Sequence, residues 1–252
     1  MIPDFGMVPL GSGNSYVPCC RALGPGVNGR GKHMPRAEQG GEKPRRQWAP
    51  DARALSVVGD RWVMVIVRDL ASGPLRLEAL RRWLPGVSAG ALEARLSRMA
   101  DAGLITRRRR RSLPPRVDLE LTEQGRALGE AIGELARWEL RTQWSRPRED
   151  EWIDVGACFR LAPLLPRAVA TADGRLALEI LDGTDSGPEH YTFVRENGCA
   201  RIERRDTPNA DARMSGTQAA WVKALSPERS PANLHVTGTP TLAAEFLDLF
   251  KV

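Results

Sequence analysis

Five consecutive arginines stand at residues 107–111 of the chain, namely Arg107, Arg108, Arg109, Arg110 and Arg111. Neighbouring like charges repel by about 1 kcal/mol per close pair in water, and binding to a polyphosphate relieves that repulsion. In a strand, successive side chains point to opposite faces, so about half of the run would reach one surface. A lone run of charge usually marks a solvated face, and the elements around this run therefore decide what it binds.

Helices are predicted ahead of the arginines. Apolar residues at three- and four-residue spacing predict one long helix, or two helices bent near Gly59, across residues 51–72. A further helix is predicted at residues 76–84. Ser88 is a suitable N-cap for the next helix, which closes near Gly103. The buried stripe of that helix is predicted to consist of Leu92, Leu96 and Met99.

After Gly103 the apolar period changes to two, as in a strand. Residues 104–106 start one strand, residues 112–115 are predicted to turn, and residues 117–121 return as a half-buried strand. Thr122 is a suitable N-cap for a helix that runs to about residue 144. The predicted apolar stripe of that helix consists of Leu128, Ala131, Ile132, Leu135 and Trp138.

Helices followed by a β-hairpin form the layout of a winged helix-turn-helix, whose recognition helix presents small or polar groups to the major groove. The arginines of the hairpin, the wing, would contact phosphates or enter the minor groove. The predicted DNA-contacting residues are Arg76, Ser88, Ala89, Glu93, Arg95, Arg98, Arg107, Arg108, Arg109, Arg110, Arg111 and Arg116.

Seven segments follow one another in a fixed order between residues 51 and 138. They are ALSVVGDRW (54–62), IVRDL (66–70), LRRWLPGVS (80–88), LEARL (92–96), AGLITR (102–107), PPRV (114–117) and LTEQG (121–125). With these segments, residues 51–138 resemble the HxlR family of winged-helix transcriptional regulators. The resemblance implies a homodimer whose first and last helices form the interface, and whose two recognition helices read a pseudo-palindromic operator in double-stranded DNA. Several members of that family use a cysteine just before the first helix as a thiol switch, whereas this chain has QWAP at residues 47–50.

The net charge of +6 is unevenly distributed along the 252 residues. Residues 1–47 carry +4, residues 48–148 carry +7 and residues 149–252 carry −5. This asymmetry indicates that the basic part meets a polyanion and the acidic part does not. Residues 1–47 are rich in Gly and Pro without periodicity, which predicts a disordered basic tail, and Met34 is an alternative start of translation.

The last hundred residues alternate strand-like runs with turn residues. Asn197 and Gly198 are a strong signal for a tight hairpin. Strands are predicted at residues 175–181, 190–196, 199–205, 211–215 and 234–237, and helices at 217–225 and 239–250.

Four segments of this part stand out before the closing helix at 242–250: LALEILDG (176–183), YTFVRENG (191–198), ADARMSG (210–216) and LHVTGTP (234–240). With these segments, this part resembles the sterol carrier protein 2 (SCP2) fold. The resemblance implies a twisted sheet with helices over an apolar tunnel for lipids or other hydrophobic molecules, which would be an effector-sensing half. Each predicted pocket residue taken alone is more often ordinary core. These residues are Leu178, Ile180, Tyr191, Phe193, Ile202, Trp221, Leu225 and Phe246.

Catalytic and membrane functions are disfavoured by the sequence. It has three histidines and no HExxH, GxSxG or P-loop motif and no Cys/His metal cluster, so no catalytic residue, metal or cofactor is predicted. The four cysteines include no CxxC pair, which favours a reducing cytoplasm over a disulfide scaffold. A membrane helix needs about 18 to 20 apolar residues in a row, and the chain has no such stretch.

The sequence therefore predicts an α+β protein of two domains after the tail at residues 1–47. Residues 48–144 form a winged helix-turn-helix domain for DNA binding and dimerisation, mostly α with a β-hairpin wing, and residues 145–252 form an α+β SCP2-like domain. The predicted function is a homodimeric, sequence-specific DNA-binding regulator, cytoplasmic and associated with the nucleoid, that responds to a small hydrophobic effector. In the alternative, the C-terminal domain carries lipid, or only adds structure or dimer contacts, without sensing an effector.

Overall fold

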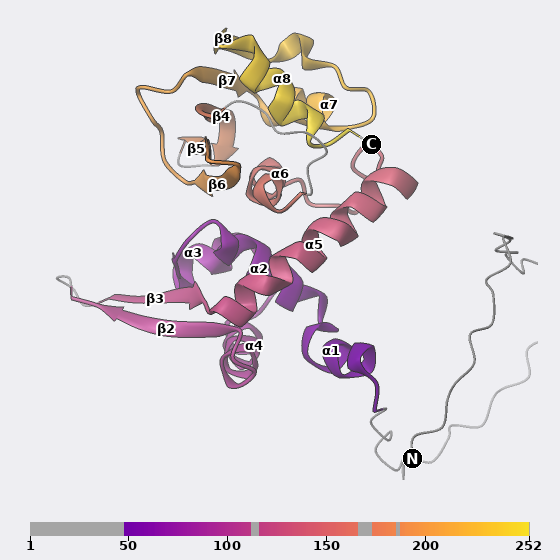
Figure 1. The fold of residues 1–252 in the computed structure, drawn as a ribbon, viewed down its shortest axis with the longest axis vertical. Coiled ribbons are helices and arrows are strands. Elements are labelled where there is room, and N and C mark those ends of the chain that lie inside the picture. The colour runs from indigo at the N-terminus through magenta and orange to yellow at the C-terminus, as the bar shows by residue number, and fades with distance from the viewer. Residues whose placement is uncertain (1–47, 112–115, 166–172, 185–186, 252) are drawn as a thin grey trace, which may run out of the picture. The chain divides into compact units, whose positions relative to one another are not determined.

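The computed structural model describes residues 48–111, 116–165, 173–184 and 187–251. The predicted tail at residues 1–47 and the predicted turn at residues 112–115 lie outside the described residues. Helices dominate the chain up to residue 142, and a five-stranded sheet dominates the part from residue 174 onward (Figure 1).

The first predicted helical segment is a pair of helices, α1 (Pro50–Val58) and α2 (Arg61–Ala71). Asp60 lies between them, and its side chain accepts a hydrogen bond at 3.0 Å from the N–H of Trp62. This bond satisfies one of the free donors at the start of α2. The structure therefore has two helices and not one long helix, and the first helix ends at Gly59.

A two-residue strand, β1 (Leu75–Arg76), leads into α3 (Leu77–Arg82), and α4 (Ala89–Asp101) follows. The hydroxyl of Ser88 accepts a hydrogen bond at 3.2 Å from the N–H of Ala91 and caps α4. Gly103, just past the end of α4, has φ +72°, a left-handed conformation that favours glycine. The predicted start and stop of α4 are confirmed.

The wing consists of β2 (Ile105–Arg110) and β3 (Arg116–Leu121), paired antiparallel. The strand β1 pairs with the other edge of β3, so the sheet order is β1-β3-β2. Thr122 caps the next helix, α5 (Glu123–Thr142), by accepting a hydrogen bond at 3.0 Å from the N–H of Gly125. The sequence predicted this cap and both long strands, but not β1, because two residues show no period.

The core of the winged-helix part contains the predicted inward stripe of α4. Leu92, Leu96 and Met99 are at most 2% exposed and pack in one cluster with side chains of α2, α3 and the wing. Fully burying one such side chain contributes about 1.5–3 kcal/mol. The burial of this stripe leaves the opposite face of α4 on the surface.

The C-terminal sheet has the order β6-β5-β4-β7-β8. The strands β4 and β7 run parallel, and all other neighbours are antiparallel. Asn197 and Gly198 have φ of 53° and 75°, as a two-residue hairpin turn between β5 and β6 requires, and the predicted hairpin is confirmed. The strands are β4 (Gly174–Thr184), β5 (Gly187–Glu196), β6 (Cys199–Glu203), β7 (Ala212–Gly216) and β8 (His235–Gly238).

One helix that the sequence did not predict, α6, lies between this sheet and α2 (Figure 1). Its Phe159 is fully buried and meets the rings of Tyr191, Trp221 and Phe246 edge-on at centroid distances of 5.4, 4.7 and 5.8 Å. The helical elements of this part are α6 (Val155–Leu161), η1 (Ala162–Leu164), α7 (Gln218–Leu225), η2 (Pro231–Asn233) and α8 (Pro240–Asp248).

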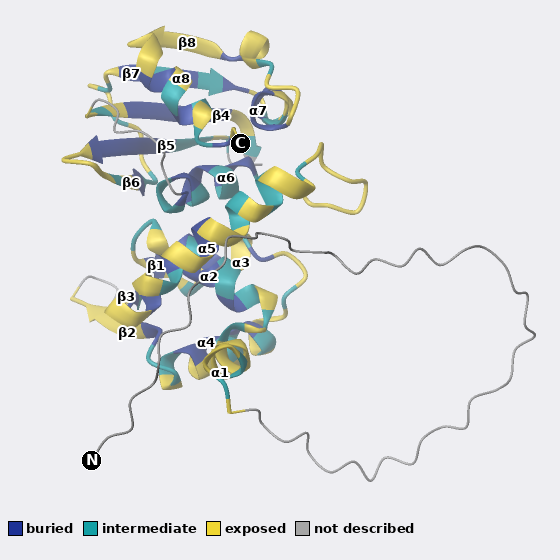
Figure 2. Ribbon diagram, turned by 45° about the vertical axis from the view of Figure 1, so that its right-hand side comes forward, coloured by how far each residue is buried: buried dark blue, intermediate teal, exposed yellow. Residues whose placement is uncertain are grey.

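The helix α5 contributes to both cores. Ile132 is buried in the winged-helix core, while Ala136 and Leu140 pack against the core of the C-terminal sheet. Leu135 and Trp138, which belong to the same predicted apolar stripe as Ile132, are 56% and 54% exposed. Figure 2 shows this alternation of buried and exposed positions along α5. Part of the stripe is therefore core, and part is an open apolar face.

Candidate nucleic-acid interface and apolar cavity

The outward face of α4 carries small and polar side chains. Ser88, Ala89 and Arg98 are exposed, and Glu93 is half-buried. Small side chains at the start of a helix allow its close approach to base edges in a major groove, and a hydroxyl or guanidinium group can form hydrogen bonds there. These four predicted residues lie outside the buried stripe of α4.

Arg95, also predicted to contact DNA, is held by the protein itself. Its Nε donates a hydrogen bond to Oδ2 of Asp60 at 2.6 Å, and its Nη1 lies 3.4 Å from the carbonyl oxygen of Ala91. Burial of the Asp60 carboxylate raises its pKa, but the hydrogen bonds from Trp62 and Arg95 outweigh burial, so the pKa of Asp60 lies below its ordinary value. Arg95 therefore ties α4 to the first turn of α2.

The arginines of the wing alternate between its two faces, as a strand requires. Arg108 and Arg110 lie beside carboxylates of β3: Arg108 is 3.4 Å from Glu120, and Arg110 is 3.2 Å from Asp118 and 2.7 Å from Glu120. Exposed ion pairs of this kind stabilise a fold by at most about 1 kcal/mol. Both guanidinium groups can therefore leave these carboxylates and bind phosphate with little loss of folding stability.

Four further predicted arginines are exposed and form no ion pair with any other described residue. Arg109 is on β2, and Arg111 follows the end of that strand. Arg76 is on β1, and Arg116 begins β3. These four arginines can bind a polyanion without first breaking an ion pair to a described carboxylate.

Arg107 joins the wing to α4. Its Nη2 lies 2.5 Å from Oε1 of Glu93, and both side chains are in contact with solvent, 39% and 46% exposed. The outward face of α4 and the arginine-bearing strand are thus adjacent at the surface. One continuous surface therefore presents both the candidate base-reading helix and the candidate phosphate-binding wing.

A second surface feature is apolar. The helix α1 contains no buried residue, and its Leu55 and Val57 are 62% and 41% exposed. Leu135 and Trp138 on α5 are also exposed. We name these four side chains the open apolar face.

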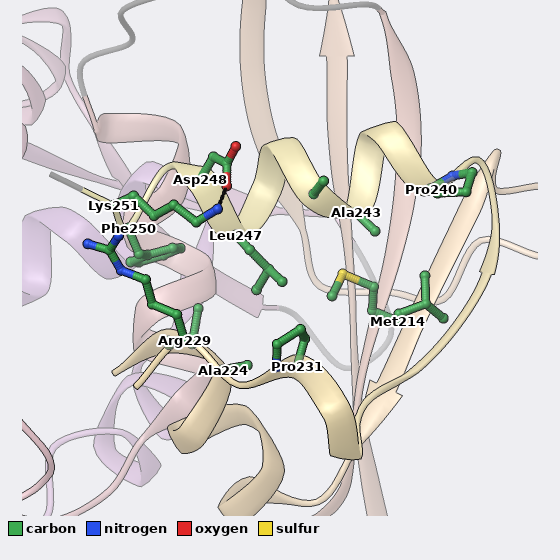
Figure 3. Close-up of a pocket in the computed structure, with 13 residues that line it drawn as sticks. Met214, Ala224, Arg229, Pro231, Pro240, Ala243, Leu247, Asp248, Phe250 and Lys251 are labelled. Atoms are coloured by element: carbon green, nitrogen blue, oxygen red, sulfur yellow. Dashed lines mark ion pairs between the residues drawn. The ribbon is translucent and has the colours of Figure 1, made fainter. Parts of the chain in front are cut away.

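The C-terminal part contains a cavity of about 280 Å³ between β7, β8, α7 and α8. Met214, Leu247 and Ala243 line its apolar wall, while Lys251 pairs with Asp248 at one end (Figure 3). An apolar wall with a few charged groups at one end is the usual composition of a small-molecule site.

Of the eight predicted pocket residues, only Leu225 lines this cavity. All eight are at most 6% exposed and belong to the core of the C-terminal sheet, and Ile180 and Tyr191 also line a separate cleft. Their apolar character was the signal that selected them, and it does not distinguish a core side chain from one at a cavity wall. The seven that do not line this cavity are Leu178, Ile180, Tyr191, Phe193, Ile202, Trp221 and Phe246.

Comparison with known proteins matches the helical part of the chain. A family model described as HxlR-like helix-turn-helix matches residues 57–147. The HTH-type transcriptional regulator YvaP of Bacillus subtilis is 32% identical over 95 residues, which are 38% of this chain and 86% of YvaP. The chain belongs to the HxlR-like helix-turn-helix family. A second relative in this family of transcriptional regulators, BH0655 of Halalkalibacterium halodurans, is 31% identical over 111 residues, 44% of this chain and 98% of that protein.

Among solved structures, the reduced form of the transcriptional regulator YodB from B. subtilis is 28% identical, with a TM-score of 0.36, and the match covers 38% of this chain and 96% of YodB. The HxlR-like segment runs from the last residues of α1 past the end of α5, and it stops before α6. It contains α4, the wing and all twelve predicted DNA-contacting residues.

No helix in the described ranges is long and apolar enough to cross a membrane.

Proposed function

We propose that this HxlR-like regulator binds double-stranded DNA with α4 in the major groove and the wing on the flanking backbone. The observation that carries this proposal is the contact between Arg107 and Glu93, which makes the outward face of α4 continuous with the arginine-bearing strand. Phosphate contacts from the wing would fix the register, and Ser88, Ala89 and Arg98 would read bases.

The proposal includes a homodimer formed through the open apolar face on α1 and α5. Four large apolar side chains exposed on two helices favour burial against a second copy. A twofold dimer presents two recognition helices, and the operator would then be a pseudo-palindrome. The regulator would act in the cytoplasm, on the nucleoid, without a catalytic step.

Salt-dependent DNA binding tests the DNA part of the proposal. The slope of log Kd against log salt falls by about 0.9 for each phosphate contact that is lost. The variant Arg109→Ala/Arg111→Ala should therefore bind a duplex more weakly, with a slope smaller by about 2. The matched control is Arg201→Ala/Arg205→Ala, which removes two exposed arginines from the C-terminal sheet and should leave the slope unchanged. Unchanged affinity and slope in the wing variant would show that the wing does not contact DNA.

We also propose that the C-terminal part binds a small hydrophobic effector in its cavity. The resemblance to the SCP2 fold, the helices beside the sheet and the cavity of about 280 Å³ support this assignment. Thermal unfolding of the full chain with a panel of fatty acids and sterols tests it, because a ligand that binds only the folded state raises the Tm. Ala244 is exposed at the cavity wall, and Ala244→Phe should abolish the rise by filling the space.

The alternative is a C-terminal part that carries lipid or only adds structure. No Tm shift across the panel would favour the structural alternative. A Tm shift without any change in DNA affinity would favour the carrier. Ligand-dependent DNA affinity in the wild type, lost in Ala244→Phe, is the result that the effector proposal predicts.

A further inference from the structure

A second cavity, of about 350 Å³, lies between the end of α3 and the C-terminal sheet. Its wall is formed by Trp83 from the winged-helix part and by Trp152, Ile153, Tyr191 and Arg204 from the part that follows α5. We name this cavity the α3 cleft. It is separate from the apolar cavity beside α8, and the two have no lining residue in common.

Arg204 in this cleft is a cation without an anion. Its guanidinium stacks on the ring of Trp83 at 4.4 Å, and its buried Nε has no hydrogen-bond partner among the described residues. No described carboxylate forms an ion pair with it. Burial lowers the pKa of Arg204 to about 10; the positive charge of Arg160 acts in the same direction, and Tyr191 and Asp69 oppose it. Arg204 is half-buried, and partial burial of a charge without an ion-pair partner has a cost that an incoming anion would offset.

The carboxylates that line the cleft already have donors. Asp154 accepts a hydrogen bond from Nη2 of Arg160 at 2.5 Å, and it also caps α6 through the N–H of Ala157. Glu189 accepts a hydrogen bond from the hydroxyl of Tyr191 at 2.9 Å. These carboxylates are directed at other groups, so the charges left for a ligand are those of Arg204 and of Arg82, an exposed residue at the end of α3 that also lines the cleft.

The rest of the cleft wall is apolar and accessible. Trp152 is 59% exposed and Ile153 is 38% exposed, although both line the cavity. Large apolar side chains that remain in contact with water at the mouth of a cavity are stabilised when a ligand covers them. The cleft thus combines the guanidinium of Arg204, with that of Arg82 beside it, and an aromatic and aliphatic surface.

We propose that the α3 cleft binds an organic carboxylate whose acid group pairs with Arg204 and whose apolar body covers Trp83, Trp152 and Ile153. A guanidinium can hold a carboxylate through two parallel hydrogen bonds. Stacking on Trp83 holds the planar guanidinium of Arg204 against the cleft wall.

The position of Trp83 links this site to the helix-turn-helix. Trp83 is the C-cap residue of α3, and the guanidinium groups of Arg204 and Arg160 both lie over its ring, at 4.4 and 4.1 Å. A ligand that moves Arg204 or covers Trp83 acts on the turn that leads into α4. This last step rests on the proposed DNA binding, whereas ligand binding at the cleft does not.

Isothermal titration of the full chain with benzoate, 4-phenylbutyrate and octanoate tests the site. Each acid has a matched neutral probe in its primary amide, and inorganic phosphate tests charge without an apolar body. At least one carboxylate should bind. Its amide and inorganic phosphate should bind about tenfold more weakly or worse, because a charge-assisted hydrogen bond changes the affinity by about that factor. No binding of the three acids, or equal binding of the acids and their amides, would overturn the proposal, as would equal binding of phosphate.

Two variants locate the binding. Arg204→Gln should weaken carboxylate binding by about tenfold or more, and Arg205→Gln, at the neighbouring exposed position, should not. Without ligand, Arg204→Gln should unfold at the same temperature as the wild type or a higher one, because it removes a half-buried charge that forms no ion pair with a described carboxylate. Trp152→Ala removes apolar wall and leaves the charge, so it should weaken the acids and their amides alike. Full affinity in both Arg204→Gln and Trp152→Ala would place the ligand elsewhere.

DNA affinity measured with and without the best carboxylate separates this inference from the proposed function. A change in DNA affinity that Arg204→Gln abolishes supports the link through Trp83. Carboxylate binding with unchanged DNA affinity would overturn the link alone. A chain that binds the carboxylate but no DNA would contradict the proposed function and leave the cleft assignment standing.

Discussion

Asp69 in α2 and Arg160 in α6 form an ion pair in which both side chains are fully buried, with 2.8 Å between Oδ1 and Nε. Arg160 also donates hydrogen bonds to Tyr191 and Asp154, at 2.9 and 2.5 Å. Burial alone would lower the pKa of Arg160, but the carboxylates of Asp69 and Asp154 raise it above its ordinary value, so the group stays charged. The pair joins the HxlR-like part to the part that follows it.

Breaking this pair should be strongly destabilising. Asp69→Ala leaves the buried guanidinium of Arg160 without one of its two carboxylates, and the expected loss in free energy of unfolding is about 3 kcal/mol or more. Urea denaturation of the full chain measures this loss. The control Asp248→Asn removes one partner of an exposed ion pair and should change the free energy by less than about 1 kcal/mol.

A double variant distinguishes the buried charge from simple packing. Asp69→Leu/Arg160→Met removes both charges, so it should be less destabilising than the sum of the two single substitutions. Strict additivity would show that the charges do not interact.

Glu120 pairs with both Arg108 and Arg110, and in the proposed complex these pairs compete with DNA phosphates. Glu120→Gln should increase affinity for a non-specific duplex several-fold and steepen the salt dependence, since Arg108 loses its carboxylate and Arg110 keeps only Asp118. Glu203→Gln is a matched control: Glu203 pairs with Arg201 and Arg205 on the C-terminal sheet, away from the wing. An equal effect of the two substitutions would mean that net charge, and not the wing, sets the affinity.

Asp60 should make stability depend on pH in the acid range. Its pKa in the folded state lies below the ordinary value of 3.8, so its contribution to stability is fully present above that value and is lost as the pH falls through the folded-state pKa. Asp60→Asn keeps a capping side chain but removes the charge near Arg95. The Tm of the variant should therefore fall less steeply than that of the wild type as the pH falls below about 4. Parallel curves would show that Asp60 titrates alike in the folded and unfolded states.

The open apolar face should control oligomeric state. Trp138→Glu places a charge within it, and the expected result is an increase of more than about tenfold in the dimer Kd, seen by light scattering after size exclusion. The control Leu181→Glu changes a similarly exposed apolar residue on β4. A wild type that is monomeric at all concentrations, or a variant that dimerises like the wild type, contradicts the proposed interface.

Local signals predicted much of the fold. Ser88 and Gly103 bounded α4 correctly, and Asn197 and Gly198 located the hairpin of the C-terminal sheet, because caps and tight turns depend on a few adjacent residues. The helix α6 escaped prediction, since it has seven residues and is fixed by packing of Phe159 among side chains that are distant in sequence.

The contacts of charged residues were harder to predict than those of apolar residues. Arg95 fits a DNA-facing position on α4, yet its carboxylate partner Asp60 lies 35 residues earlier. Arg160 and Asp69 are separated by 91 residues, and no pattern in either segment indicates the other. An arginine in a sequence shows where a charge lies, but only the fold shows whether a carboxylate already holds it.

Selection of binding sites from a random library of DNA duplexes tests the central claim most directly. The full chain should enrich a pseudo-palindrome whose half-sites lie about 10 base pairs apart, or a multiple of that spacing, because two α4 helices related by a twofold axis enter successive major grooves. Enrichment of no motif, or of a single motif without symmetry, would contradict a dimeric, sequence-specific regulator.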